Sequence, residues 1–179
     1  MSTDGFLWSN AVLSEHGTLT RKGWPETYDQ DGLRAAVSAL RTGPAMFPGY
    51  SHGIYDIDPA LSRTVAPPDI LILEGLGLPD RSAGLDLLVY LDADETDLED
   101  WFARRFVEFW RAAEHDPASF YARFRGMNEP EVEVFARSVV WGQMNLPNLR
   151  GNIILARDAA DIVVRKQADH SLWLAGPGG

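Results

Sequence analysis

The chain has 179 residues, of which 45% are hydrophobic, and it contains no cysteine. This length and apolar content suit a globular domain with a full core. The lack of cysteine excludes disulfides, thiolate zinc sites and cysteine nucleophiles. The net charge of −10 argues against a nucleic-acid partner, because affinity for the phosphate backbone comes from clustered Lys and Arg.

No apolar stretch reaches the roughly 20 residues of a membrane-spanning helix. The first residues also lack the basic and apolar segments of a signal peptide. We therefore expect a cytoplasmic location and no membrane partner. We expect a single domain over residues 1–175, followed by a flexible Gly-Pro-Gly-Gly tail at 176–179.

In the first third of the chain, residues 1–28 are rich in Gly, Pro and polar side chains, which predicts loops with one short helical turn near 10–16. Asp29 is a suitable cap for a helix over 30–42, whose apolar residues recur at helical spacing. Gly43 and Pro44 then end that helix, and 43–67 is expected to be an ordered loop with short extended stretches.

The middle of the chain contains two apolar runs. The run at 70–73 follows two prolines and predicts a strand buried on both faces of a parallel sheet. The run at 85–91 predicts a second such strand. Thr96 and Glu99 have the spacing of a capping box, which predicts the start of a long helix that reaches about Ala113.

The last third of the chain is predicted to contain further helices and short strands. Helices are expected over 116–124 and 131–143, and short strands over 152–155, 162–164 and 171–174. Alternating strands and helices predict an α/β fold, with a mostly parallel sheet flanked by helices.

Distinctive motifs occur throughout the chain. They are TDGFLWSN at 3–10, KGWPETYD at 22–29, YSHGIYDI at 50–57, PDILILEGL at 68–76, VYLDAD at 89–94, WFARRF at 101–106, DPASFY at 116–121, QMNLPNL at 143–149 and NIILARDAADIVVRKQADH at 152–170. In this order and spacing they resemble the C-terminal part, somewhat more than half, of bacterial type I pantothenate kinase, a P-loop kinase related to uridine kinase and phosphoribulokinase. The resemblance implies a partial P-loop kinase-like three-layer fold, with ATP and Mg²⁺ as cofactors.

The phosphate-binding loop of that superfamily is missing from the sequence. No G-x-x-x-x-G-K-[ST] motif occurs, so the chain lacks the backbone nest and the lysine that hold the nucleotide phosphates. The resemblance places this loop in the N-terminal portion of the family, which this chain does not match. We therefore expect weak or incomplete kinase activity from the chain by itself.

Two carboxylates are candidates for the chemistry. Asp4 matches the acid of the TDGF motif that the resemblance implies is the catalytic base, although an Asp beside Gly5 is more often a turn residue. Glu74 follows the predicted strand at 70–73, at the edge where open parallel sheets bind ligands, and is a candidate magnesium ligand. The alternative for Glu74 is a helix cap or a salt bridge.

Several further residues are candidates through the resemblance. Tyr50, His52 and Asn145 match residues that hold pantothenate, and Arg105 matches an Arg that contacts substrate or phosphate. His170 matches a His near the adenine. The alternatives are a satisfied structural His, an Asn that ends a helix, and an Arg paired with Glu108 or Asp100.

The aromatic residues of the long helix can be interpreted either as part of a ligand site or as core. Phe106 and Phe109 match the wall that receives the pantetheine arm of coenzyme A, the feedback inhibitor, although such a stripe is more often core. Phe102 stands where the family usually has a substrate-binding Tyr, and the loop between Gly75 and Leu85 is shorter than in the family. Both departures bear on the identity of the substrate.

The leading hypothesis is a pantothenate kinase-like protein that phosphorylates the pantothenate hydroxyl with ATP, the first step of coenzyme A biosynthesis. Two alternatives stay open. One is a non-catalytic module that binds pantothenate or coenzyme A, or that pairs with a kinase as a homodimer or through a complementing P-loop fragment. The other is a related kinase for a nucleoside or another small alcohol.

Overall fold

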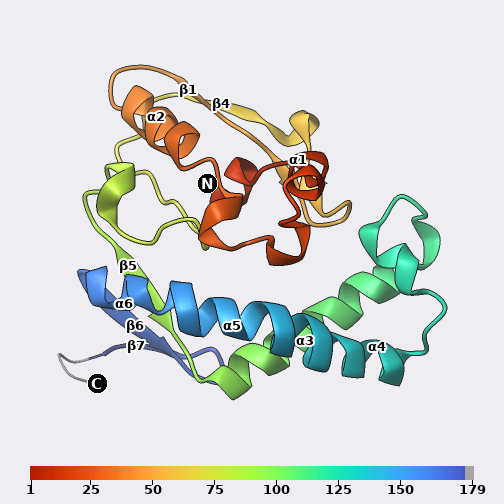
Figure 1. Ribbon diagram of the computed structural model, residues 1–179. Helices are drawn as coiled ribbons and strands as arrows, with labels where there is room; N and C mark the ends of the chain where they lie inside the picture. Colours follow the sequence, from red (N-terminus) through yellow and green to blue (C-terminus); the bar gives the residue numbers. More distant parts are fainter. Residues whose placement is uncertain (176–179) are drawn as a thin grey trace. The chain divides into compact units, whose positions relative to one another are not determined.

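The computed structural model describes residues 1–175, and the predicted tail at 176–179 lies outside the described residues. The chain forms two compact units, Met1–Leu88 and Val89–Gly179, whose elements are labelled in Figure 1. The expectation of a single domain over 1–175 stays a prediction. None of the helices in the described part combines the length and the hydropathy that crossing a bilayer requires.

The first unit contains two α-helices, two small hairpin-like sheets and short 3₁₀ turns. Its elements are η1 (Thr3–Phe6), α1 (Asn10–Glu15), η2 (Leu19–Arg21), η3 (Pro25–Thr27), α2 (Gln30–Leu40), β1 (Ala45–Phe47), β2 (Tyr50–Ser51), β3 (Asp56–Ile57), η4 (Pro59–Leu61), β4 (Arg63–Val65) and η5 (Arg81–Ala83). β1 pairs with β4 and β2 with β3, both antiparallel. The helix predicted over 30–42 is thus confirmed, and Asp29 caps it by accepting from the backbone of Gly32.

The core of the first unit lies between α2 and β1. Leu33, Val37 and Leu40 present one face of α2 to Phe6 and Phe47, and all five side chains are buried. The rings of Phe6 and Phe47 meet edge to face with centroids 5.9 Å apart. This core fixes η1, and with it Asp4, against the rest of the unit.

The strand predicted at 70–73 is wrong as stated. The segment forms no regular strand, and Ile70 and Ile72 are exposed. Leu71 and Leu73 pack against the core, while the backbone pairs with the first residues of the chain: Met1 N donates to Ile72 O at 2.5 Å and Glu74 N to Met1 O at 2.9 Å. Residues 1–88 therefore cover only one face of this segment.

The second unit combines a mixed three-stranded sheet with two long helical segments. Its elements are β5 (Val89–Asp92), α3 (Glu95–Ala112), η6 (Ala113–His115), η7 (Phe120–Phe124), α4 (Glu129–Phe135), the π-helical η8 (Ala136–Asn145), α5 (Leu146–Asn148), the π-helical η9 (Leu149–Ile153), α6 (Leu155–Ala159), β6 (Ile162–Lys166) and β7 (Leu172–Leu174). β5 runs parallel to β6, and β7 is antiparallel to β6. Among residues 1–175, β5–β6 is the one parallel ladder of named strands, so the expected mostly parallel sheet is not assembled there.

Two predicted boundaries of the second unit differ from the structure. The strand expected over 85–91 is β5, which begins only at Val89. The expected capping box at Thr96 is wrong, because α3 already begins at Glu95 and its N-cap residue, Asp94, bonds Arg165 instead. The strands expected over 162–164 and 171–174 are confirmed as β6 and β7.

The predicted strand over 152–155 is wrong, because this stretch is helical. It continues the run that begins at α4, as Figure 1 shows for α4, α5 and α6. Ile154 N donates to Leu149 O at 2.9 Å, and the side chain of Asn152 donates to Asn148 Oδ1 at 2.9 Å. The apolar run at 153–155 is too short to show a periodicity that separates a strand from a buried helix.

Candidate functional site

Asp4 lies in the turn η1, which is held from two sides. Thr3 N donates to Glu74 O at 2.8 Å, and Asp4 N donates to Ser2 Oγ at 3.3 Å. A Cβ on Gly5 would lie only 1.9 Å from the carbonyl oxygen of Pro48, so the turn can approach that backbone only with glycine at this position. These contacts fix the backbone from which the Asp4 side chain extends.

Each oxygen of the Asp4 carboxylate lies near a ring side chain of the first unit. Oδ1 accepts from the phenol of Tyr28 at 3.4 Å, and Oδ2 lies 3.8 Å from Nε2 of His52. Burial raises the pKa of Tyr28, and the nearby Asp4 charge and hydrogen bond raise it further. The phenol is therefore a permanent donor at neutral pH, and Asp4 is held as a partly accessible acceptor.

Tyr50 and His52 lie on the β2–β3 hairpin, which brings His52 beside this carboxylate. Their ring centroids are 5.2 Å apart at an interplanar angle of 73°. Tyr55 closes the hairpin with a φ of 57°, a conformation that a bulky non-glycine residue rarely adopts. Its ring lies 6.3 Å from that of Tyr50. The hairpin therefore gathers three aromatic rings with polar edges, of which that of His52 lies next to Asp4.

Lys22 is a member of this cluster that the sequence reasoning missed. Its side chain is 2% exposed, and Nζ donates to Asn10 Oδ1 at 2.7 Å and to Tyr55 O at 2.8 Å. Nζ also lies 4.9 Å from the ring centroid of Tyr50 and 4.8 Å from that of Tyr55. A lysine is rarely buried without a role, but the sequence alone offered only its position in the motif at 22–29.

The charge of Lys22 is balanced within the first unit. Burial lowers its pKa to about 8, and the carboxylates of Asp56 and Asp4 oppose that shift. Asp56 Oδ1 lies 3.8 Å from Nζ. At neutral pH most molecules therefore carry an ammonium here, and that cation can stabilise negative charge that forms nearby.

Glu74 follows Leu73 and pairs with the backbone of residues 1–3 rather than capping a helix. Its side chain is exposed, and residues 1–175 contain no group of three or more His, Asp or Glu side chains that could hold a metal ion. Magnesium often uses only one or two protein carboxylates together with waters and substrate phosphates. The role of Glu74 as a magnesium ligand stays a prediction, and the sequence contains no G-x-x-x-x-G-K-[ST] motif for the triphosphate of ATP.

Phe102, Phe106 and Phe109 lie on α3 in an aromatic cluster of the second unit. Phe106 is 6% exposed and meets the ring of Tyr121 edge to face at 5.1 Å. Phe109 stacks on the same Tyr121 at 5.1 Å, and Phe102 lies 5.9 Å from Trp141. Phe106 is thus a core residue in this structure, while Phe102 and Phe109 are half-buried.

Arg105 and Asn145 are also in the second unit. Arg105 is exposed on α3, and Asn145 is half-buried at the last position of η8. Asp100, one partner considered for Arg105, instead accepts from Arg137 at 2.7 Å. The roles that the resemblance implies for Arg105 and Asn145 stay predictions.

His170 is held by an aromatic contact. It has a φ of 67°, and its ring stacks on Trp101 with centroids 4.9 Å apart. Nζ of Lys166 lies 4.1 Å from the Trp101 centroid. These three side chains form one stack in the second unit, and a role for His170 near adenine stays a prediction.

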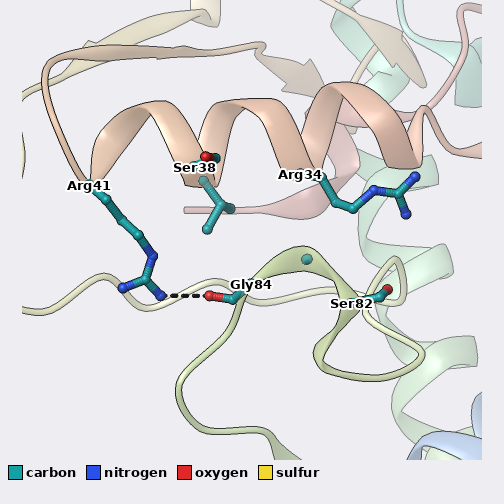
Figure 2. A pocket seen from close by; sticks show the side chains of 7 residues that line it. Arg34, Ser38, Arg41, Ser82 and Gly84 are labelled. Carbon is teal, nitrogen blue, oxygen red and sulfur yellow. Dashed lines mark hydrogen bonds between the residues drawn. The ribbon is translucent and has the colours of Figure 1, made fainter.

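A separate hollow of about 240 Å³ lies between α2 and η5, as Figure 2 shows. Its polar lining includes Arg34, Ser38 and Arg41. Arg41 donates to Gly84 O at 2.6 Å and pairs with Asp86 at 3.0 Å, and Arg34 pairs with Asp31. None of the predicted site residues lines this hollow.

The chain is similar to curated pantothenate kinases along nearly all of its length. It is 40% identical to the enzyme of Sorangium cellulosum over 183 residues, 41% identical to that of Mycolicibacterium gilvum over 180, and 38% identical to that of Klebsiella pneumoniae over 187. Each match includes 96% of this chain but only 57 to 59% of the relative. The chain thus spans somewhat more than half the length of these relatives. No family model matches the sequence.

A solved structure of another protein is similar to the chain in fold. It is a protein from Silicibacter sp. TM1040, provisionally described as a kinase of a fructose transport system, and it superposes with a TM-score of 0.53 at 27% identity. The superposition covers 76% of this chain and 69% of that protein. By sequence, the chain is homologous to pantothenate kinases over a little more than half of their length.

Proposed function

We propose that this chain is the acceptor-binding portion of a pantothenate kinase. It binds pantothenate through the cluster around Asp4, and it supports phosphorylation only when the phosphate-binding portion of such a kinase is also present. One observation carries the proposal: the Asp4 carboxylate accepts from the phenol of Tyr28 beside His52, with a buried ammonium close by at Lys22.

The geometry suits an alcohol as the ligand of Asp4. A carboxylate that is already fixed by a phenol can accept a further hydrogen bond from a substrate hydroxyl, and can take its proton when that oxygen becomes a nucleophile. The ammonium of Lys22 offsets negative charge at the same place. Tyr50 and His52 supply polar ring edges for the amide and carboxylate of pantothenate.

ATP does not fit the described residues. Its phosphates need a nest of backbone N–H groups and a lysine at a helix start, and the sequence contains no such motif. Glu74 would share a magnesium ion that arrives with those phosphates. The chain by itself is therefore expected to bind the acceptor without phosphorylating it.

Calorimetry on the purified chain tests the proposal. We expect pantothenate to bind and ATP to give no binding heat. Asp4→Asn should weaken pantothenate binding about tenfold, because a charge-assisted hydrogen bond is lost. Asp69→Asn, an exposed site with the same charge change, should leave the affinity unchanged. Absence of pantothenate binding, or equal effects of both variants, would contradict the proposal.

A related small-alcohol kinase is the second candidate. Phe102 has no hydroxyl where the resemblance implies a substrate-binding Tyr, which favours an acceptor that makes one polar contact fewer. A panel of nucleosides and small alcohols in the same calorimeter distinguishes the two. Binding of another alcohol more tightly than pantothenate would favour this candidate.

A further inference from the structure

The turn of the β2–β3 hairpin has a backbone conformation that needs support. Tyr55 lies in this turn with a φ of 57°, in the left-handed region that bulky residues rarely adopt. Such a residue keeps this conformation only where the surrounding contacts hold it. The same turn carries His52, whose Nε2 lies 3.8 Å from Oδ2 of Asp4. The contacts that hold Tyr55 therefore bear on the position of His52.

Asn10, the first residue of α1, supplies part of this support. Its side-chain Nδ2 donates to Tyr55 O at 2.9 Å, and its backbone N donates to Asp56 Oδ1 at 2.9 Å. These partners are 45 and 46 residues away in sequence. One residue at the start of α1 thus binds two consecutive residues of the hairpin.

The oxygen of the same Asn10 amide orients Lys22. Oδ1 accepts from Lys22 Nζ at 2.7 Å, and that Nζ also donates to Tyr55 O at 2.8 Å. The Tyr55 carbonyl therefore accepts two hydrogen bonds, one from an amide and one from an ammonium. A side-chain amide has both a donor and an acceptor, and both are used here. A carboxylate in its place could accept from Lys22 but could not donate to Tyr55.

We propose that Asn10 is a positioning residue, which holds Tyr55 in the left-handed conformation and thereby fixes the turn that places His52 beside Asp4. Without the Asn10 side chain, the Tyr55 carbonyl loses one donor and Lys22 loses the acceptor that orients it. The turn can then relax toward an ordinary negative φ. The consequence for pantothenate rests on the proposed function, whereas the conformation of the hairpin is a property of the first unit alone.

Hydrogen exchange of backbone amides tests the proposal. In Asn10→Ala, the amides of residues 50–57 should exchange about tenfold faster than in the unchanged chain, because the hairpin opens locally. The amides of α2 should be accelerated less. Ser9→Ala is the matched control, because it removes the N-cap of α1, where Ser9 Oγ accepts from Val12 N at 3.4 Å, without removing a contact to the hairpin. It should leave the exchange of residues 50–57 nearly unchanged.

Asn10→Asp separates the proposed role from the stability of α1. The new carboxylate still accepts from Lys22, and a negative charge in the first turn of a helix is favourable. The urea midpoint of unfolding should therefore fall less than in Asn10→Ala. Because the donor to Tyr55 O is lost, the amides of residues 50–57 should still exchange faster than in the unchanged chain.

Calorimetry connects the turn to the proposed function. Asn10→Ala and Asn10→Asp should each weaken pantothenate binding severalfold, because the apparent affinity falls with the fraction of molecules in the binding conformation. Ser9→Ala should leave the affinity unchanged.

Two results would overturn the proposal. One is exchange over residues 50–57 that is unchanged in both Asn10 variants, and the other is pantothenate affinity in these variants equal to that of the unchanged chain. If the unchanged chain binds no pantothenate, the proposed function fails, and the exchange rates alone decide whether Asn10 holds the turn.

Discussion

The phenol of Tyr28 donates to Oδ1 of Asp4 across 3.4 Å and joins two segments of the first unit that are 24 residues apart in sequence. Tyr28 is buried, and its pKa is raised by that burial and by the Asp4 charge. The donor therefore keeps its proton whenever Asp4 is charged. This pair orients the carboxylate that we propose contacts the acceptor.

Tyr28→Phe removes this donor and should lower the free energy of unfolding by about 1 kcal/mol. Because the folded-state pKa of Tyr28 is raised above its ordinary value of 10.0, the contribution is present below pH 10 and decreases as the pH rises above 10. Urea unfolding at pH 8 and near pH 10.8 measures both effects. In an Asp4→Asn background the effect of Tyr28→Phe should be smaller, and an unchanged effect would contradict the pairing.

Lys22 makes stability depend on pH in the opposite direction. Its pKa is lowered from 10.5 to about 8 in the folded chain, so the unfolded chain binds more protons between these values. The stability that the buried ammonium removes at neutral pH is therefore regained as the pH rises through this window. Between pH 7.5 and 9.5 the unchanged chain should gain about 1–2 kcal/mol relative to Lys22→Met.

Lys166→Met is the matched control for that measurement. Lys166 lies over the Trp101 ring in the second unit and is only half-buried. The difference in unfolding free energy between the unchanged chain and Lys166→Met is measured over the same range, from pH 7.5 to 9.5. A slope of the same size for both variants would argue against a special environment for Lys22.

The sequence predicted the elements whose information is local. Helix α2 follows from the Asp29 cap and the spacing of Leu33, Val37 and Leu40, and β6 from its apolar run. The prediction of a buried strand at 70–73 is wrong because burial of a strand depends on which other elements pack against its two faces. Residues 1–88 cover only one face of this segment. Local composition cannot reveal that difference.

The site was predicted only in part for a related reason. The motifs identified Asp4, Tyr50 and His52, which the structure brings together. They did not identify Lys22 or Tyr28, whose importance comes from burial and from partners 33 and 24 residues away. Contacts between residues so far apart in sequence leave no periodic pattern of residue types. They can therefore be identified only in the folded structure.

Gly5 should be among the least replaceable positions of the first unit. A Cβ there would overlap the carbonyl oxygen of Pro48 at 1.9 Å, and a backbone atom cannot rotate away. Gly5→Ala should therefore lower the free energy of unfolding by about 1–3 kcal/mol and weaken pantothenate binding by displacing Asp4. At Gly126 an added Cβ would meet no heavy atom within 4 Å apart from the chain neighbours. Gly126→Ala should therefore change neither the free energy of unfolding in urea nor the affinity in calorimetry.

Phe102 offers a test of substrate identity. It is half-buried on α3, 5.9 Å from the Trp141 ring, and the resemblance implies a substrate-binding hydroxyl at this position. If pantothenate is the acceptor, Phe102→Tyr should tighten its binding severalfold, because one new hydrogen bond contributes about 1 kcal/mol. Phe109→Tyr adds the same hydroxyl to a ring that stacks on Tyr121 and should have no such effect in calorimetry. Tighter binding of another alcohol by the unchanged chain, lost on Phe102→Tyr, would instead show that Phe102 selects a different acceptor.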